Sequence, residues 1–213
     1  MSTPLRILIT GFGPFPGAPF NPTARLVHHL AHLRRPAFAD VDRISHIFTV
    51  SYAAVDADLP RLIAEYHPDA LLMFGLAART PHIRIETRAR NAMSTLWPDA
   101  AGTRIQRGVI EPGMQARGFG PHTHRLLRAA WRSGADVRSS RDAGRYLCNY
   151  LCWRGIDAAA QPNGPAIAAF IHVPLVAREP GATGMPMDQL NRAGEMLLLE
   201  ILRLARAQRR RCN

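Results

Sequence analysis

A thiol, an imidazole and a carboxylate in this sequence could together carry out acyl transfer. Cys148 lies in RYLCNYLCW, inside the start of a predicted helix, where aligned amide dipoles favour a thiolate over a thiol. His172 lies in AAFIHVPL, near the carboxyl end of an otherwise apolar strand, which suits a general base. Glu86 lies near the end of another strand, where it could orient an imidazole. A nucleophile, a base and an orienting acid are the set that thiol acyl transfer requires.

Each of these residues also has a purely structural interpretation. Free cysteine is often buried and simply packs. A lone strand histidine is often a core residue with both ring nitrogens bonded, and Glu86 could instead pair with a neighbouring arginine such as Arg84. Cys152 follows Cys148 by one helical turn, but the C-x-x-x-C spacing is not that of a redox or zinc pair, so Cys152 is interpreted as a core residue.

Alternating strands and helices must position these side chains. Apolar or alternating runs predict strands over 5–10, 43–50, 70–74, 82–88 and 166–173, with a short strand at Val137. Helical spacing and caps predict helices from Asn21-Pro22 onward and over 54–66, 123–131, 143–155 and 188–208. This order predicts an α/β fold, a three-layer α/β/α sandwich with a mostly parallel, twisted central sheet.

Length and composition favour a single domain inside the cell. The 213 residues contain no linker or repeat, so we expect one domain over 1–213, with about 209–213 as a flexible basic tail. No apolar run approaches the roughly 18 residues of a membrane helix. The N-terminus lacks the pattern of an export signal, and three cysteines do not make a disulfide framework. We therefore expect a cytoplasmic protein with no membrane partner.

The strong positive charge does not by itself indicate a nucleic-acid partner. The formal net charge is +11, but every basic residue other than histidine is arginine, and the arginines are spread along the chain. A nucleic-acid footprint usually clusters on one face or alternates with aromatic residues. His28 and His32 have the i, i+4 spacing of a metal pair, yet no H-E-x-x-H motif surrounds them. We expect no nucleic-acid partner and no metal site.

Four segments, in order, carry a resemblance to a known family. They are ITGFGPFPGAPFNPT, GLAARTPHIRIETRARN with Glu86 and Asn91 in an E-x4-N pattern, AGRYLCNYLCW and FIHVPLV. They resemble the opening motif, the carboxylate segment, the nucleophile segment and the base segment of the pyroglutamyl peptidase I family, also called pyrrolidone-carboxylate peptidases. The resemblance implies a cysteine peptidase that removes N-terminal pyroglutamyl groups from peptides through a thioester acyl-enzyme.

The same resemblance implies roles for individual residues. Cys148, His172 and Glu86 match the catalytic nucleophile, base and orienting acid. The substrate-binding residues it implies are Phe12, Phe15, Asn21 and Leu76, with the two aromatic rings holding the lactam. It implies no metal or organic cofactor, and it implies a homo-oligomer, commonly a tetramer.

Some positions depart from the family pattern. Arg79-Thr80 displaces an arginine by one position, Thr87 follows the carboxylate where arginine is usual, and Leu96 occupies the place of an arginine expected near the reacting carbonyl. Arg79 or Arg88 could compensate. Two alternatives stay open: a cysteine amidase acting on another small acyl or lactam group, and a weakly catalytic homologue that binds an acidic partner or RNA through its arginines.

Overall fold

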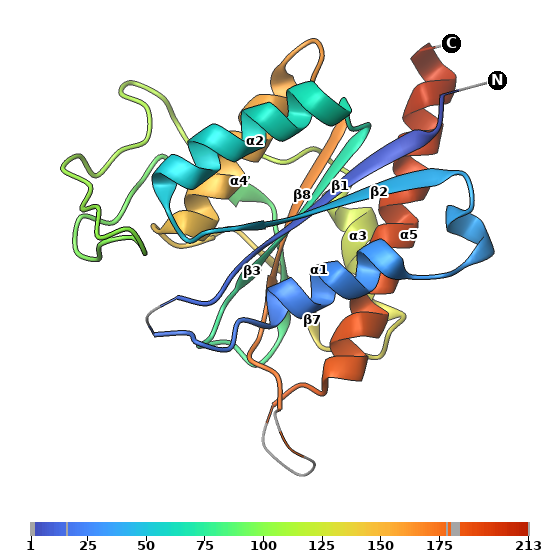
Figure 1. The fold of residues 1–213 in the computed structure, drawn as a ribbon, viewed down its shortest axis with the longest axis horizontal. Helices are drawn as coiled ribbons and strands as arrows, with labels where there is room; N and C mark the ends of the chain where they lie inside the picture. Colours follow the sequence, from blue (N-terminus) through green and yellow to red (C-terminus); the bar gives the residue numbers. More distant parts are fainter. Residues whose placement is uncertain (1–2, 16, 178, 180–183, 213) are drawn as a thin grey trace.

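A six-stranded sheet forms the centre of the molecule (Figure 1). The computed structural model describes residues 3–15, 17–177, 179 and 184–212. Its strands lie in the order β2 (Val41–Phe48), β1 (Leu5–Phe12), β3 (Ala70–Leu76), β8 (Ile167–Val173), β4 (Ile83–Glu86) and β7 (Val137–Ser140). The first four are parallel, whereas β4 is antiparallel to β8 and parallel to β7. The predicted mostly parallel sheet is confirmed, with two strands reversed.

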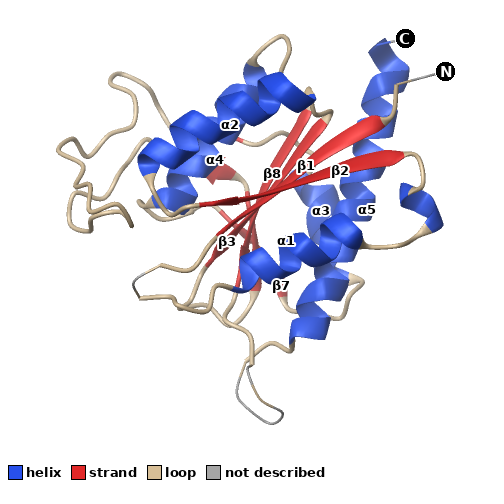
Figure 2. Cartoon of the chain, viewed as in Figure 1, coloured by secondary structure: helices blue, strands red, loops and turns tan. Residues whose placement is uncertain are grey.

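Helices cover both faces of this sheet (Figures 1 and 2). One face packs against α1 (Pro22–His32), α3 (Thr123–Trp131) and α5 (Met187–Cys212). The other packs against α2 (Tyr52–Tyr66) and α4 (Leu147–Ala160). A short 3-10 helix, Pro36–Phe38, and a two-stranded ribbon of β5 (Arg88–Ala89) and β6 (Arg117–Gly118) complete the described elements. The three-layer α/β/α sandwich is therefore confirmed.

The strand sequences explain why both faces are covered. Along β1, Ile7 and Ile9 pack in the α1–α5 layer while Leu8 packs in the α2–α4 layer. Along β3, Leu72 packs in the α1–α5 layer and Leu71 packs in the α2–α4 layer. Successive side chains of a strand point to opposite faces, so an uninterrupted apolar run buries apolar area on both. These runs hold the sheet rigidly between the helix layers.

The turn between β1 and α1 is fixed by its own polar side chains. Asn21 caps α1 by accepting a hydrogen bond from the Thr23 backbone at 3.1 Å, and Pro22 occupies the first turn as predicted. The Asn21 amide also donates to the carbonyl of Gly13 at 3.1 Å. This capping fixes the loop that carries Phe15 beside the end of β1.

Helix α4 begins later than the sequence pattern predicts. The predicted helix starts near Ala143, but the observed first residue is Leu147, and Tyr146 before it is extended. Gly144 has a φ of 84°, in the left-handed region that glycine adopts readily. A turn rather than a helix therefore precedes Leu147, and Cys148 becomes the second residue of α4.

The predicted flexible basic tail is wrong as far as residue 212, because α5 continues to Cys212. Arg209 explains this continuation: its Nε and Nη2 bind the two carboxylate oxygens of Asp69 at 2.5 and 2.7 Å. Its guanidinium also donates to the carbonyls of Thr3 and Pro4. Asn213 lies outside the described residues. Within the described part of the chain, no helix combines the length and apolar character needed to cross a bilayer.

Two asparagines organise the long segment between β5 and α3. The side chain of Asn91 exchanges hydrogen bonds with the backbone of Ile110, Glu111 and Met114. Asn149, fully buried on α4, binds the backbone of Arg90 and Ala92 through three hydrogen bonds of 2.8 to 2.9 Å. The segment predicted as a loop is thus tied to the helix that carries Cys148.

The variant Asn149→Ala tests this tie. It leaves the half-buried N–H of Arg90 and carbonyl of Ala92 without this partner, while the carbonyl of Arg90 still accepts from the N–H of Ala92, so we expect the free energy of unfolding to fall by about 1–2 kcal/mol. Urea denaturation followed by circular dichroism measures the change, with Asn163→Ala, on an exposed turn, as the control. Equal stability of the Asn149→Ala variant and the parent would contradict the assignment.

Candidate active site

Most of the residues singled out in the sequence line one small cavity. Its volume is about 170 Å³ and its walls include Phe12, Phe15, Asn21, Leu76, Cys148 and His172. Four elements contribute: the end of β1 with its following loop, the end of β3, the start of α4 and β8. The structure therefore brings together a thiol, an imidazole and two aromatic rings from distant parts of the chain.

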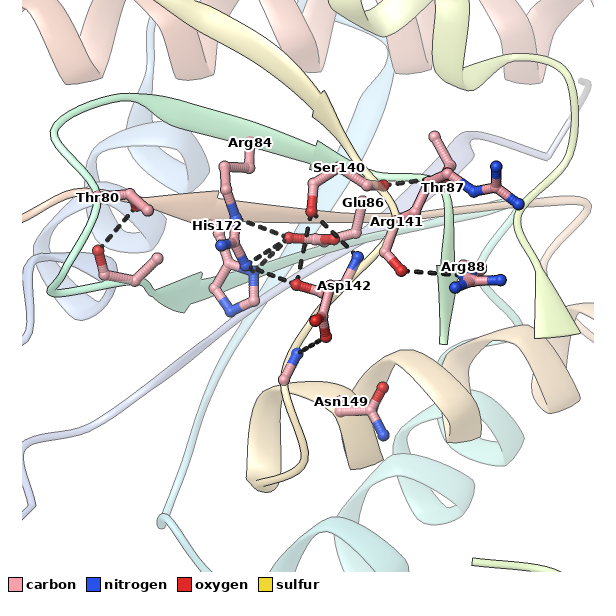
Figure 3. Close-up of polar contacts among 12 residues, drawn as sticks. Thr80, Arg84, Glu86, Thr87, Arg88, Ser140, Arg141, Asp142, Asn149 and His172 are labelled. Carbon is pink, nitrogen blue, oxygen red and sulfur yellow. Dashed lines mark hydrogen bonds and ion pairs between the residues drawn. The ribbon is translucent and has the colours of Figure 1, made fainter. Parts of the chain in front are cut away.

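Glu86 does not line this cavity, but it bonds to His172, which does (Figure 3). Its Oε1 is 2.7 Å from His172 Nδ1, and the two residues are 0% and 3% exposed. Because β4 runs antiparallel to β8, Glu86 pairs with Phe170 and reaches His172 along the diagonal. The carboxyl ends of β4 and β8 therefore do not lie at one edge of the sheet, although both side chains still meet.

The buried pair favours an ionised acid and a neutral base. Burial opposes ionisation of Glu86, but the hydrogen bond and charge interaction with His172, together with Arg84, lower its pKa overall. Burial also lowers the pKa of His172, against the raising effect of Glu86. A neutral ring that donates Nδ1–H to Glu86 leaves its Nε2 lone pair available, since Nε2 has no partner among the described residues.

The surroundings of Cys148 favour the protonated thiol. Burial is the main cause that raises the pKa of Cys148 to about 12, and the charge of Glu86 adds to it. Arg84 and the backbone of Leu76 act in the opposite direction but do not outweigh burial. Burial therefore opposes the thiolate that the start of α4 favours, and a base that removes the thiol proton suits these surroundings.

Gly75 is a site residue that sequence reasoning did not identify. It pairs with His172 across β3 and β8. A Cβ atom at this position would lie 2.7 Å from Cys148 Sγ and 2.6 Å from the Phe170 ring. Glycine inside an apolar strand often marks a close approach by another group, which is the signal that could have identified it. Here the close groups are the thiol of Cys148 and the ring of Phe170.

Arg84 is a second residue without a predicted role in catalysis. Its guanidinium contacts Glu86 Oε1, His172 Nδ1 and the carbonyl of Asp142 at 2.9 to 3.1 Å (Figure 3). The arginines proposed to compensate at the site do not reach it: Arg88 donates to the carbonyl of Arg141, and Arg79 is absent from the cavity wall.

The remaining departures from the family pattern have structural explanations or lie outside the cavity. The hydroxyl of Thr87 donates to the carbonyl of Ser140 at 2.8 Å and so joins β4 to β7. Leu96 is 74% exposed and does not line the cavity. The side chain of Asn21 is occupied by Thr23 and Gly13, so its contribution to the cavity is to hold the loop in place.

No other part of the described chain offers an equivalent site. A larger cavity of about 640 Å³ lies between α2 and α4, but neither Cys148 nor His172 lines it. Among the described residues, no group of three or more histidine, cysteine, aspartate or glutamate side chains could hold a metal ion. The chemistry-bearing residues are gathered in the cavity at Cys148.

Comparison with known proteins identifies the family. The sequence profile of pyroglutamyl peptidase matches residues 5–193. A pyrrolidone-carboxylate peptidase of Deinococcus radiodurans is 31% identical over 199 residues, covering 88% of this chain and 89% of the relative. That of Pyrococcus furiosus is 30% identical over 173 residues, covering 81% and 82%. A solved structure of the Pyrococcus furiosus pyrrolidone carboxyl peptidase has a TM-score of 0.84 at 26% identity, covering 94% of this chain and 100% of that chain.

A match over most of the chain and a shared fold agree with the four motifs and with the cavity that they form. The chain belongs to the pyroglutamyl peptidase family of cysteine peptidases.

Proposed function

We propose that this protein removes N-terminal pyroglutamyl groups from peptides, with Cys148 as nucleophile, His172 as base and Glu86 as orienting acid. The observation that carries the proposal is the shared cavity, in which Cys148 and His172 face the same space while Glu86 bonds to His172. The names of the family and of its relatives give the substrate class.

Proton transfer precedes or accompanies attack in the proposed reaction. Nε2 of His172 takes the thiol proton of Cys148, and the sulfur bonds to the pyroglutamyl carbonyl carbon. The imidazolium then gives its proton to the leaving amine as the amide bond breaks, which leaves a thioester. Water, deprotonated by the same imidazole, hydrolyses the thioester and restores the thiol. Glu86 stabilises the imidazolium in both halves.

The first turn of α4 is suited to the negative charge that forms on the carbonyl oxygen. The first backbone N–H groups of a helix have no partner within the helix, and Cys148 is the second residue of α4. The amide of Cys148 can therefore donate to the oxyanion as the sulfur of the same residue forms the new bond.

The cavity fits a small uncharged ring. A pyroglutamyl group has no ammonium, so its recognition depends on shape, apolar contact and a few amide bonds. Phe12 and Phe15 supply apolar walls, and the volume of about 170 Å³ lies below the roughly 300–1,000 Å³ typical of larger ligands. Among the described residues, none that lines the cavity carries a carboxylate to attract a free terminal amine, which favours the lactam over an ordinary N-terminus.

Two expectations stay predictions. They are the homotetrameric assembly implied by the family resemblance and the cytoplasmic location inferred from the cysteine count and the N-terminal sequence. Size-exclusion chromatography with light scattering would measure the first.

The nucleophile is tested by a matched pair of cysteine variants. We expect Cys148→Ala to lose all measurable hydrolysis of a pyroglutamyl fluorogenic amide, because no other group in the cavity can form the thioester. Cys152→Ala should keep activity, since Cys152 is fully buried in the core. Activity in the Cys148→Ala variant would refute the assignment, and turnover by the parent of other acyl amides alone would favour the broader amidase.

The pH profile of kcat/KM tests the state of the base. Because burial lowers the pKa of His172 below its usual 6.5, the neutral imidazole persists to lower pH than in solution. The acidic limb should therefore have its midpoint below pH 6.5, with activity lost as pH falls through it. A midpoint above pH 6.5 would contradict the neutral resting state.

The space at Gly75 provides a steric test. A methyl group there would push against Cys148 Sγ, so Gly75→Ala should lower kcat by roughly 100-fold through misplacement of the nucleophile. The same substitution at Gly13, where the nearest atoms are 3.7 Å away, serves as control. Unchanged kcat with an unchanged fold would show that the close approach has no catalytic importance.

A further inference from the structure

Arg84 lies where it can act on all parts of the proposed catalytic set. It is directly opposite His172 in the antiparallel pairing of β4 and β8, and 21% of its side chain is exposed. Its Nε and Nη2 lie 3.0 and 2.9 Å from Glu86 Oε1. Nη2 also donates to the carbonyl of Asp142 at 2.9 Å, in the turn that leads to α4. One guanidinium thus joins the acid to the segment that precedes the nucleophile.

The hydrogen-bond geometry shows whether Arg84 donates to Glu86 or to His172. His172 Nδ1 is 2.7 Å from Glu86 and 3.1 Å from Arg84 Nη2, and a single ring nitrogen cannot donate to one and accept from the other. Glu86 is ionised and needs donors, so Nδ1 donates to it. Arg84 therefore bonds to the carboxylate, and its charge lies beside the imidazole without a bond to it.

The charged groups near His172 among the described residues come from two segments. Strand β4 contributes the carboxylate of Glu86 and the guanidinium of Arg84, and the segment before α4 contributes Asp142 and Arg145, of which Arg145 lines the same cavity. Helix α4 contributes the thiol of Cys148, whose surroundings favour its neutral form. Strand β3 contributes Gly75, which carries no charge. After burial, the charge of Arg84 is what lowers the pKa of His172, and Arg84 is also the arginine that contacts Glu86.

We propose that Arg84 is a positioning residue of the catalytic site, which holds Glu86 against His172, ties both to the turn before Cys148, and keeps the imidazole unprotonated in mildly acidic solution. The proposal rests on the proposed function for its catalytic meaning. It assigns to Arg84 a role beyond that of a surface ion pair, because Glu86 is fully buried and both accepts a hydrogen bond from Nε of Arg84 and lies in ion-pair contact with Nη2.

The direction of the pH effect does not depend on which group takes the proton. Glu86 and His172 form a coupled pair whose protonation belongs to the pair as a whole. A proton added to either group raises the positive charge beside Arg84. Removal of the guanidinium charge therefore makes protonation easier, and the acidic midpoint of activity must move to higher pH.

Two substitutions distinguish the effect of the positive charge of Arg84 from the effect of its planar guanidinium group. In Arg84→Gln, we expect the acidic midpoint of kcat/KM to move up by about one pH unit, and kcat at its plateau to fall by roughly 10-fold with little change in KM. Arg84→Lys keeps the charge but lacks the planar fork that reaches Glu86 and Asp142 together. Its midpoint should stay close to that of the parent while kcat still falls.

The control removes an arginine in the same row of the sheet. Arg138 pairs with Arg84 across β4 and β7, but its side chain binds Asp136 and contacts neither Glu86 nor His172. Arg138→Gln should leave both the midpoint and kcat unchanged. Circular dichroism and urea denaturation of each variant measure any loss of folding separately from catalysis.

A measurement independent of turnover distinguishes this proposal from the proposed function. NMR of histidine-labelled protein gives the titration of His172, whose signal is assigned by its loss in His172→Asn. The titration midpoint should rise in Arg84→Gln even if the parent hydrolyses no pyroglutamyl amide, an outcome that would refute only the proposed function. An unmoved His172 titration in folded Arg84→Gln, or an equal shift in Arg84→Lys, would overturn the role of Arg84.

Discussion

The buried hydrogen bond between Glu86 and His172 is the constraint on which the site depends. A carboxylate with no exposed surface is costly unless it is paired and bonded, and the imidazole and guanidinium beside it both bond to Oε1 of Glu86, whereas Oε2 is buried without a hydrogen-bond partner among the described residues. The hydrogen bond between Glu86 and His172 fixes the imidazole ring on β8 with Nδ1 turned toward Glu86 on β4. Because Nδ1 is already hydrogen-bonded, Nε2 is the nitrogen available to the thiol of Cys148. The orientation of the imidazole therefore follows from the free-energy cost of burying Glu86.

Burial also determines how the thiol can act. The start of a helix favours a thiolate, but the sulfur of Cys148 lies close to Gly75 and to the backbone of Leu76, and desolvation raises the pKa of the thiol instead. These surroundings favour a neutral thiol and a neutral imidazole over an ion pair. In the proposed reaction, charge separates as the thiol attacks, where the first turn of α4 can stabilise the oxyanion. The same low-polarity surroundings suit the uncharged lactam.

Much of this arrangement could be predicted because it depends on local patterns. The cap at Asn21, the buried strands and the alternation of Ile83 with Ile85 follow from residue type and spacing. The gathering of Phe12, Phe15, Cys148 and His172 in one cavity agrees with the motifs that they occupy. The late start of α4 and the continuation of α5 to Cys212 were not predicted. They depend on the turn at Gly144 and on the long-range pairing of Arg209 with Asp69.

The direction of β4 could not be predicted for a more general reason. Alternation of apolar and polar residues is the same in both chain directions. The pattern of Ile83 and Ile85 therefore predicts which side chains share a face of the sheet, but it does not predict whether β4 is parallel or antiparallel to its neighbours. The antiparallel pairing places Arg84 opposite His172, with Glu86 two residues further along β4. A parallel β4 would have a different register against β8. The partnership of Arg84 with the catalytic pair is therefore a property of topology, and it became visible only when the strands were placed side by side.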